Sequence, residues 1–350
     1  MEKMVKNNFY KNKKILITGN TGFLGAWLTI ALLEKKSTIY GLSNSYEKNG
    51  LFKLLNLEKK INYQKLDIRN YKKLKDYFKK KKFDIIIHLA AEPLVFKSFL
   101  FPKATIENNF ITTLNLIDCI KDFKNILFIN FTTDKVYQNS GKKKNLFSEK
   151  SDTFGTDPYS FSKSCSDMLT HVWSKSLGSP IKFLNIRCGN IIGGLDWNEK
   201  RIITDIVNSL FNKKKLYLRQ PSSIRPWIHV YEVINYLLNL IKNHKKIKQN
   251  YSAWNIGPNK QDAISVNILK NKFFKLHKIK NTTSIKKEKN IFDKKFLIID
   301  NKKIINFLTN KYLFDLNKRI DLTYNCYKEF FNNKKNITSF AIKEIKKYIL

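Results

Sequence analysis

The chain has 350 residues, of which 66 are Lys or Arg and 28 are Asp or Glu, so its formal net charge is +38. This length is enough for one large domain or two closely joined domains. No run of about 18 uncharged apolar residues occurs, so we expect no membrane-spanning helix and no membrane partner.

The N-terminal segment and the cysteines indicate the compartment. The first residues, MEKMVKNNFYKNKK, are polar and lack the apolar core of a secretory signal. The four cysteines, Cys119, Cys165, Cys188 and Cys326, lie far apart without paired spacing. Neither a metal site nor a disulfide framework is therefore expected. We expect a cytoplasmic protein.

The positive charge raises the question of a nucleic-acid partner. Only six of the basic residues are Arg, which is the residue that contacts phosphates and guanines through paired hydrogen bonds. Lysines are spread along the chain in runs such as 79–82, 142–144 and 213–215. This scatter is typical of an AT-rich coding bias, so we do not expect nucleic acid as a partner. The charge should still attract anionic substrates.

The first half of the chain alternates short apolar runs with helical patterns. The expected strands are 14–18, 38–42, 61–66, 84–89, 126–131 and 182–187, and the expected helices are 23–35, 71–80, 105–121 and 159–176. Near-continuous apolar runs are typical of strands that are buried on both faces. Strands and helices in alternation predict an α/β fold with a Rossmann-type, doubly wound parallel sheet.

The pattern becomes mixed after about residue 190. We expect residues 1–188, with a returning segment at about 226–260, to form an NAD-binding Rossmann domain. Residues 189–225 and 261–350 are expected to form a smaller, mixed α/β substrate-binding domain. Within the tail, 296–299 resembles a late strand and 321–332 a helix.

A glycine-rich turn follows the first expected strand, in KILITGNTGFLGAWL. Gly19, Gly22 and Gly25 would let the backbone approach a pyrophosphate at the start of a helix. A plain structural turn is the alternative. The second strand ends without an acidic residue for a ribose hydroxyl and without Arg for a 2′-phosphate, so NAD is favoured over NADP only modestly. Asp67 would contact the adenine or cap a helix.

Tyr159 and Lys163 stand four residues apart in DPYSFSK. On a helix, this spacing places both side chains on one face. A phenol has a pKa of about 10 and is a poor base at neutral pH, but a nearby ammonium favours the phenolate. The pair therefore predicts proton removal from a substrate hydroxyl during a nicotinamide-dependent redox step.

With its TGxxGxxG loop and YxxxK pair, the chain resembles the extended short-chain dehydrogenase/reductase family. The resemblance implies that Thr133 bonds the reacting oxygen and that Asn109 supports Lys163. The implied cofactor residues are Gly19, Asn20, Thr21, Gly22, Phe23, Leu24, Gly25, Asp67, Ile68, Leu89, Ala90, Ala91, Asn109, Tyr159 and Lys163. Relatives often dimerise through the helix that carries this Tyr, so a homodimer is expected.

The stretch FTTDKVY narrows this resemblance to the sugar-nucleotide 4,6-dehydratases. The branch that acts on CDP-glucose has Ser/Thr-Asp-Lys at this position, and RCGNIIGGLDW and RPWIHV also match it. The resemblance implies oxidation at C4 by NAD, loss of water across C5 and C6, and return of hydride to C6. Lys135 would remove the C5 proton and Asp134 would protonate the leaving hydroxyl. The catalytic residues would be Thr133, Asp134, Lys135, Tyr159 and Lys163, and deoxysugars for a bacterial surface polysaccharide are the implied product class.

The substrate site would include a planar guanidinium, which suits a diphosphate. Arg225 is the first candidate, and Arg187, Asn190 and Arg219 are weaker ones. Arg201 would line the nucleotide pocket or merely start a helix. The implied substrate residues are Glu92, Thr133, Asn190, Arg201, Arg219, Arg225 and Trp227.

Three positions depart from the family pattern. Glu92 stands where Gln is usual, Phe96 stands where Arg is usual, and the His-Glu of the tail is replaced near Phe292 and Asp293. These departures affect the expected nucleotide and sugar. Another enzyme of the same fold, such as an epimerase, decarboxylase or reductase, is the first alternative. A non-enzymatic NAD-sensing or RNA-binding protein is the second.

Overall fold

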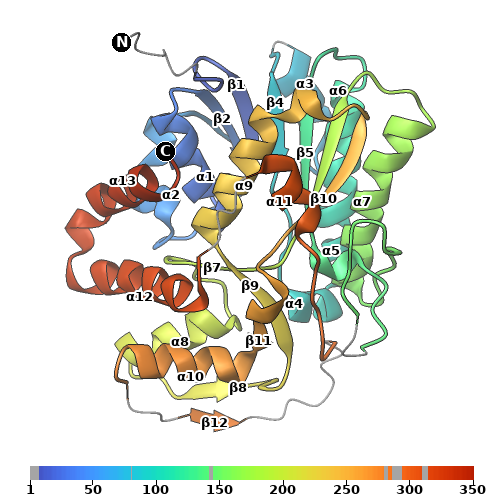
Figure 1. The fold of residues 1–350 in the computed structure, drawn as a ribbon. Helices are drawn as coiled ribbons and strands as arrows, with labels where there is room; N and C mark the ends of the chain where they lie inside the picture. Colours follow the sequence, from blue (N-terminus) through green and yellow to red (C-terminus); the bar gives the residue numbers. More distant parts are fainter. Residues whose placement is uncertain (1–7, 80, 142–144, 280–282, 286–293, 310–313) are drawn as a thin grey trace, which may run out of the picture.

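Seven parallel strands form the main sheet of the protein. They are β1 (Lys14–Thr18), β2 (Thr38–Ser43), β3 (Asn62–Lys65), β4 (Ile85–His88), β5 (Leu127–Thr133), β6 (Lys182–Cys188) and β10 (Tyr251–Ile256). Their order is β10-β6-β5-β4-β1-β2-β3, and it reverses between β1 and β4 (Figure 1). This is the Rossmann arrangement, so the predicted fold class is confirmed. The computed structural model describes residues 8–79, 81–141, 145–279, 283–285, 294–309 and 314–350.

Side chains of the central strands alternate between two apolar cores. Ile15 and Ile17 of β1 belong to one core, together with Trp27. Leu16, which lies between them, belongs to the other core with Leu74. Both faces of β1 are therefore buried, which is why its sequence is a continuous apolar run.

Helices cover both faces of the sheet. The first core includes side chains from α1 (Phe23–Glu34), α9 (Val230–Lys242), α11 (Lys302–Leu308) and α13 (Ile337–Tyr348). The second core is covered by α3 (Tyr71–Lys79), α6 (Thr112–Ile120) and α7 (Pro158–Lys175). No helix within the described residues is both long and apolar enough to cross a membrane.

A smaller unit lies beyond the C-terminal ends of the parallel strands, below them in Figure 1. It contains a three-stranded sheet in the order β11-β9-β7 and a two-stranded pair of β12 and β8. Its elements are β7 (Asn190–Ile192), α8 (Ile202–Phe211), β8 (Leu216–Leu218), β9 (Ile224–His229), β11 (Ala263–Ser265), α10 (Val266–Leu276), β12 (Thr283–Ile285) and α12 (Leu316–Asn332). The predicted domain boundaries stay a prediction. β10, from the returning segment, joins the main sheet. α11 and α13, from the tail assigned to the substrate-binding domain, pack beside α9 and α1 respectively.

The expected helix 105–121 is interrupted. The chain instead forms α5 (Pro102–Ile106), a π-helical segment (Glu107–Ile111) and α6, and α4 (Val95–Leu100) precedes them. A π turn inserts an extra residue and rotates the side chains that follow it, and such turns are frequent near functional sites. Periodicity alone could not reveal this insertion. A further short helix, α2 (Leu51–Leu54), follows β2.

The two expected elements of the tail have different outcomes. Residues 321–332 lie in α12, which begins earlier because Asp315 caps it and accepts a hydrogen bond from Lys318 N. The expected strand 296–299 is wrong. Phe296 and Ile299 each form one isolated bridge, to Ile224 and to Phe147 respectively, instead of a ladder. The run 142–144 and the expected replacement at Phe292 and Asp293 lie outside the described residues.

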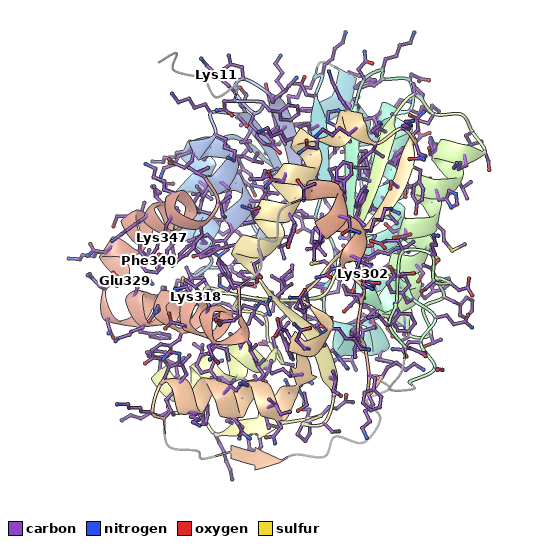
Figure 2. All side chains as sticks on the ribbon, in the orientation of Figure 1. Lys11, Lys302, Lys318, Glu329, Phe340 and Lys347 are labelled. Atoms are coloured by element: carbon purple, nitrogen blue, oxygen red, sulfur yellow. The ribbon has the colours of Figure 1, made fainter. Side chains whose placement is uncertain are left out.

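Basic side chains are distributed around the molecule. Nitrogen-tipped side chains project along the whole outline in Figure 2. Lys11 and Lys347, which are exposed, lie on separate parts of the surface. This distribution resembles a general surface bias more than a single anion-binding face.

Candidate active site

A cavity of about 930 Å³ lies at the C-terminal ends of the parallel strands, where open α/β sheets bind their ligands. Both the main sheet and the smaller unit contribute to its wall. It brings together most of the residues that were predicted from the sequence, namely Gly19, Thr21, Gly22, Phe23, Leu24, Gly25, Asp67, Ile68, Leu89, Ala90, Ala91, Thr133, Asp134, Lys135, Tyr159, Lys163, Asn190, Arg201, Arg219, Arg225 and Trp227.

The glycine-rich turn joins β1 to α1 at one end of this cavity. Gly19 has a φ of +70°, and a Cβ atom there would lie 2.7 Å from the backbone N of Ala90. A Cβ atom on Gly25 would lie 2.3 Å from the carbonyl oxygen of Gly19. Gly22 is the N-cap of α1, and its Cβ would meet only the Gly19 oxygen, at 3.4 Å. The backbone therefore borders the cavity closely at a helix N-terminus, which fits a pyrophosphate.

The end of β2 and Asp67 border the cavity beyond this turn. Asp67 accepts hydrogen bonds from Arg69, including one of 2.6 Å from Nη2, and this contact lowers the pKa of the carboxyl group. Asn70, which accepts from Lys73 N at 3.0 Å, is placed to cap α3. Asn70 rather than Asp67 therefore takes the capping position, and the carboxylate of Asp67 borders the cavity as the partner of Arg69.

Tyr159 and Lys163 both enter the cavity from α7. This helix starts at Pro158, after Asp157 accepts a hydrogen bond from Ser160 N at 2.9 Å. The pair lies on one helical face, as the spacing predicts. Lys163 Nζ donates to the carbonyl oxygen of Phe131 in β5 at 2.8 Å, which fixes the ammonium under the site.

Burial controls the acidity of both groups. It raises the pKa of Tyr159 to about 12, against the opposing effects of a hydrogen bond with Thr133 and of the Arg201 charge. It also lowers the pKa of Lys163 to about 8, while Asp167 acts in the opposite direction. The net shift of the phenol is thus opposite to the shift expected from a neighbouring ammonium alone. Enclosure of the hydroxyl outweighs that attraction.

Three polar residues follow one another where β5 ends. Thr133 Oγ1 accepts from Lys135 N at 3.3 Å and donates to Asp134 Oδ1 at 3.1 Å. This arrangement starts a 3₁₀ turn over Asp134–Val136. Asp134 is 2% exposed and Lys135 is half-buried. A hydroxyl, a carboxyl and an ammonium group therefore border the cavity close to Tyr159.

The arginines of the smaller unit line the cavity, and two of them already have acidic partners. Arg201 pairs with Asp196 at 2.9 Å, and Arg219 pairs with Asp205 at 2.6 Å. Arg225 is 3% exposed and donates to Ile224 O at 2.7 Å. Arg201 lines the cavity and also occupies the N-cap position of α8, and its contact with a nucleotide stays a prediction.

Arg187 does not line the cavity, so the structure gives no support to this weaker diphosphate candidate. Its guanidinium makes two hydrogen bonds with Asp167 of α7, at 2.6 and 3.0 Å, and both side chains are buried. Asp167 lies one turn after Lys163. The ion pair therefore anchors α7, which carries Tyr159 and Lys163, to β6.

Three of the predicted site residues are not in the cavity wall. Asn20 links the glycine-rich turn to the end of β2, because its Oδ1 accepts a hydrogen bond from Ser43 Oγ at 3.0 Å. Asn109 lies in the π-helical segment, accepts from Glu92 N at 2.7 Å and donates to Ser162 Oγ at 2.9 Å. Glu92 itself accepts from Leu94 N at 3.1 Å. The roles of these residues in binding stay predictions.

Lys200 and Trp197 are among the residues of the cavity wall that sequence reasoning missed. Lys200 Nζ lies 4.2 Å from the centroid of the Phe96 ring, and both side chains line the cavity. Lys200 therefore places a positive charge beside Phe96, the position at which the family pattern has Arg. Trp197 ends the motif RCGNIIGGLDW, and the sequence alone gives it no role of its own. No spacing pattern singles out Lys200 among so many lysines.

His88 is a third residue that the sequence did not single out. Its Nδ1 lies 2.7 Å from Thr18 Oγ1, and its Nε2 lies 3.1 Å from Thr113 Oγ1. Burial, and secondarily the charge of Lys163, lower the pKa of His88 to about 3. The imidazole is therefore neutral at physiological pH. It joins the ends of β1 and β4 at the point where the strand order reverses.

A Rossmann sheet, a glycine-rich turn and a buried Tyr-x-x-x-Lys pair define the short-chain dehydrogenase/reductase class. Residues 16–317 match the family described as GDP-mannose 4,6 dehydratase. The chain belongs to this family.

Curated relatives narrow the comparison. The chain is 32% identical over 283 residues to CDP-glucose 4,6-dehydratase of Salmonella typhimurium, which covers 78% of this chain and 79% of that protein. It is 27% identical over 252 residues to dTDP-glucose 4,6-dehydratase of Escherichia coli, which covers 66% of this chain and 69% of that one.

Solved structures share the fold at low sequence identity. UDP-glucose 4-epimerase of Thermotoga maritima gives a TM-score of 0.79 at 19% identity and covers 91% of this chain and 100% of its own. dTDP-glucose 4,6-dehydratase of Bacillus anthracis, solved with NAD, gives 0.77 at 22% identity and covers 92% and 98%. Because an epimerase and a dehydratase match equally well, the fold alone does not distinguish their reactions.

Proposed function

We propose that the protein is an NAD-dependent CDP-glucose 4,6-dehydratase that forms CDP-4-keto-6-deoxyglucose. The observation that carries this proposal is the presence of Asp134 and Lys135 beside Tyr159 in one cavity. Oxidation of a hydroxyl needs one proton acceptor, whereas elimination of water needs two further proton transfers. Asp134 and Lys135 provide the two additional groups.

The cofactor proposal rests on the glycine-rich turn and its surroundings. A bound nicotinamide would supply reversible hydride transfer, from C4 of the sugar and back to C6, so that no net cofactor would be consumed. The backbone around Gly19 and Gly22 would hold the pyrophosphate, and Asp67 would accept hydrogen bonds from the adenine. The end of β2 provides Ser43 and Asn44 at the cavity, without a cationic group for a 2′-phosphate there.

The residues of the chain have separate tasks in this cycle. Tyr159, hydrogen-bonded with Thr133, would take the proton of the 4-hydroxyl as the phenolate, after giving up its own proton. Lys163 would hold positive charge beneath it, fixed by its bond to Phe131 O. Lys135 would remove the C5 proton once C4 is a ketone, and would return a proton to C5 when hydride reaches C6. Asp134 would give a proton to the departing 6-hydroxyl.

The diphosphate of the substrate would lie in the basic part of the cavity. Arg225 is the first proposed ligand because it lines the cavity, and its planar guanidinium suits paired contacts with phosphate oxygens. Arg219 and Arg201 would add charge while keeping their partners Asp205 and Asp196. Asn190 and Trp227 border the same region.

One assay tests the proposal directly. Purified protein, NAD and CDP-glucose in deuterated water should give a 4-keto-6-deoxy product that carries deuterium at C5. A Lys135→Ala variant should lose about 10²–10⁴-fold in kcat, because a positioned base contributes about that much. It should still oxidise the substrate at C4. Lys150→Ala, at an exposed lysine outside the cavity, is the matched control.

Each alternative result has a defined meaning. Turnover of dTDP- or GDP-linked glucose in place of CDP-glucose would contradict the nucleotide assignment. Interconversion of C4 epimers without loss of water would identify an epimerase. Full dehydration by Lys135→Ala would contradict the assignment of the base.

We also propose that the protein forms a homodimer through α7. Phe161, Met168 and Val172 lie on one helical face and are 46%, 51% and 49% exposed, with Cys165 between them. Contiguous apolar exposure of this kind marks interaction surfaces. A Met168→Lys variant should sediment as a monomer where the wild type sediments as a dimer. Ile268→Lys, at a similarly exposed residue of α10, should leave the dimer intact, and a dimeric Met168→Lys protein would contradict the proposal.

A cytoplasmic location is the third part of the proposal. All four cysteines are free, which is usual in a reducing compartment. Cell fractionation should recover the protein with the cytoplasmic enzymes. Recovery among exported proteins would contradict this assignment.

A further inference from the structure

The segment 44–50, which we call the cofactor loop, follows β2 and forms the outer wall of the cavity beside the glycine-rich turn. Its residues from 44 to 49 are exposed, and Ser45, Tyr46, Glu47 and Gly50 border the cavity. At its start, Thr21 Oγ1 donates to Ser45 O at 2.7 Å. This contact ties the loop to the glycine-rich turn.

The other end of the cofactor loop is held by the distant half of the chain. Trp197 Nε1 donates to the carbonyl oxygen of Asn49 at 2.8 Å. Lys334 Nζ donates to the side-chain oxygen of the same residue at 3.2 Å. Trp197 belongs to the segment between β7 and α8, and Lys334 to the turn between α12 and α13. Two independent contacts therefore meet at Asn49.

Trp197 is itself fixed by aromatic packing. Its ring centroid lies 5.3 Å from that of Tyr327, 5.1 Å from Phe330 and 6.1 Å from Phe331. Tyr327 also donates to the carbonyl oxygen of Asp196 at 2.7 Å. The indole N–H is thus presented to Asn49 by a rigid cluster on α12 and does not rest on a mobile side chain.

We infer that Trp197 and Lys334 are positioning residues that keep the cofactor loop closed against bound NAD. The inference rests on the proposed function, in which NAD is the cofactor. An enzyme that returns its cofactor to the starting state in each cycle gains nothing from releasing it. The contacts of Trp197 and Lys334 with Asn49 hold the cofactor loop in place, and they would therefore slow the release of NAD. The residues would act on affinity for NAD through the position of the loop.

The test measures NAD binding to the full-length protein. In Trp197→Phe the ring still packs against α12 but cannot donate to Asn49. We expect its affinity for NAD to fall by about fivefold, the effect of one typical hydrogen bond on an equilibrium constant. Lys334→Met should weaken NAD binding by a smaller factor. Lys335→Met, at the neighbouring exposed lysine, should bind NAD like the wild type.

Two further readouts separate positioning from general stability. The apparent KM for NAD should rise more than kcat changes, and less NAD should remain with the variants after gel filtration. Lys334→Met should have no additional effect in an Asn49→Ala background, because the acceptor of its hydrogen bond is already absent. Thermal unfolding of the NAD-free proteins should be similar for all of these variants.

The outcomes distinguish the inference from the proposed function. If the wild type binds NAD and both variants bind it equally tightly, the inference is overturned while the function stands. If the wild type does not bind NAD, both are overturned. An additive effect of Lys334→Met and Asn49→Ala would overturn the assigned contact.

Discussion

Replacing Tyr159 by Phe should reduce kcat for dehydration of CDP-glucose by about 10²–10⁴-fold, the range typical of a lost general acid or base. The ring would still fill its buried position, so the change removes little more than the hydroxyl that bonds with Thr133. Steady-state assays at saturating substrate measure the loss. The affinity for NAD should change much less than kcat.

A second Tyr→Phe variant controls for the substitution itself. Tyr71 lies on α3, does not line the cavity and is 36% exposed, so Tyr71→Phe should retain activity close to that of the wild type. Near-normal dehydration by Tyr159→Phe would contradict the assigned proton acceptor.

The ammonium beneath this Tyr gives the reaction a high-pH limit. The pKa of Lys163 is lowered to about 8, so its charge is present below that pH and is lost above it. We expect kcat/KM of the wild type to fall as the pH rises through about 8. A pH profile of initial rates would show this fall.

Replacing Arg319 by Met should destabilise the protein by about 3–5 kcal/mol, the cost of leaving a buried charge without its partner. Arg319 is 0% exposed. Its guanidinium contacts Glu232 at 2.8 and 3.1 Å and Asp262 at 3.1 Å. Burial raises the pKa of Glu232, while the hydrogen bond and the charge of Arg319 oppose this shift. Unfolding by urea would measure the loss.

Two comparisons sharpen that experiment. Adding Glu232→Gln to Arg319→Met should restore part of the stability, because the orphaned carboxylate is removed. Lys79→Met, which breaks an exposed pair with Asp76, should cost no more than about 1 kcal/mol. A loss below that value for Arg319→Met would contradict a dominant role for the buried pair.

The Arg319 cluster also explains how the tail is joined to the site. Glu232 lies in the first turn of α9 and closes a capping box with His229, the last residue of β9. Arg225 and Trp227 belong to the same strand. A single guanidinium on α12 therefore holds the start of α9 beside the strand that carries the proposed diphosphate ligand.

The sequence predicted six of the seven strands of the main sheet because these strands leave a strong local signal, but it did not predict β10 as a strand. Runs such as 14–18 and 126–131 are apolar on both faces, and turns or helices separate them clearly. The smaller unit has no comparable signal. β7, β8 and β11 each contain three residues, and their pairing depends on partners far away in the sequence. Phe296 and Ile299 are apolar because they pack against the rest of the protein, as strand residues do, yet each forms only one isolated bridge.

The candidate site divides in the same way. The glycine-rich turn and the Tyr159–Lys163 pair are local patterns, and both border the cavity. Whether an arginine faces the cavity, and which acidic residue it pairs with, depends on the folded structure. Arg187 pairs with Asp167 on another element, and Arg201 pairs with Asp196 while facing the cavity. Lys200, in the segment before α8, comes to lie beside Phe96 of α4 only when the chain folds. The contact of Trp197 with Asn49 spans both units of the fold.

The last strand of the main sheet imposes an order on biosynthesis. β10 pairs with β6 over six residues, from Tyr251 opposite Phe183 to Ile256 opposite Cys188, but residues 189–250 are made in between. Until residue 256 has left the ribosome, β6 is an edge strand with unpaired backbone groups and largely apolar side chains. At about 5–20 residues per second, that interval lasts about 3–14 s. A nascent chain paused there presents a surface for chaperones, or for the same edge of another unfinished copy.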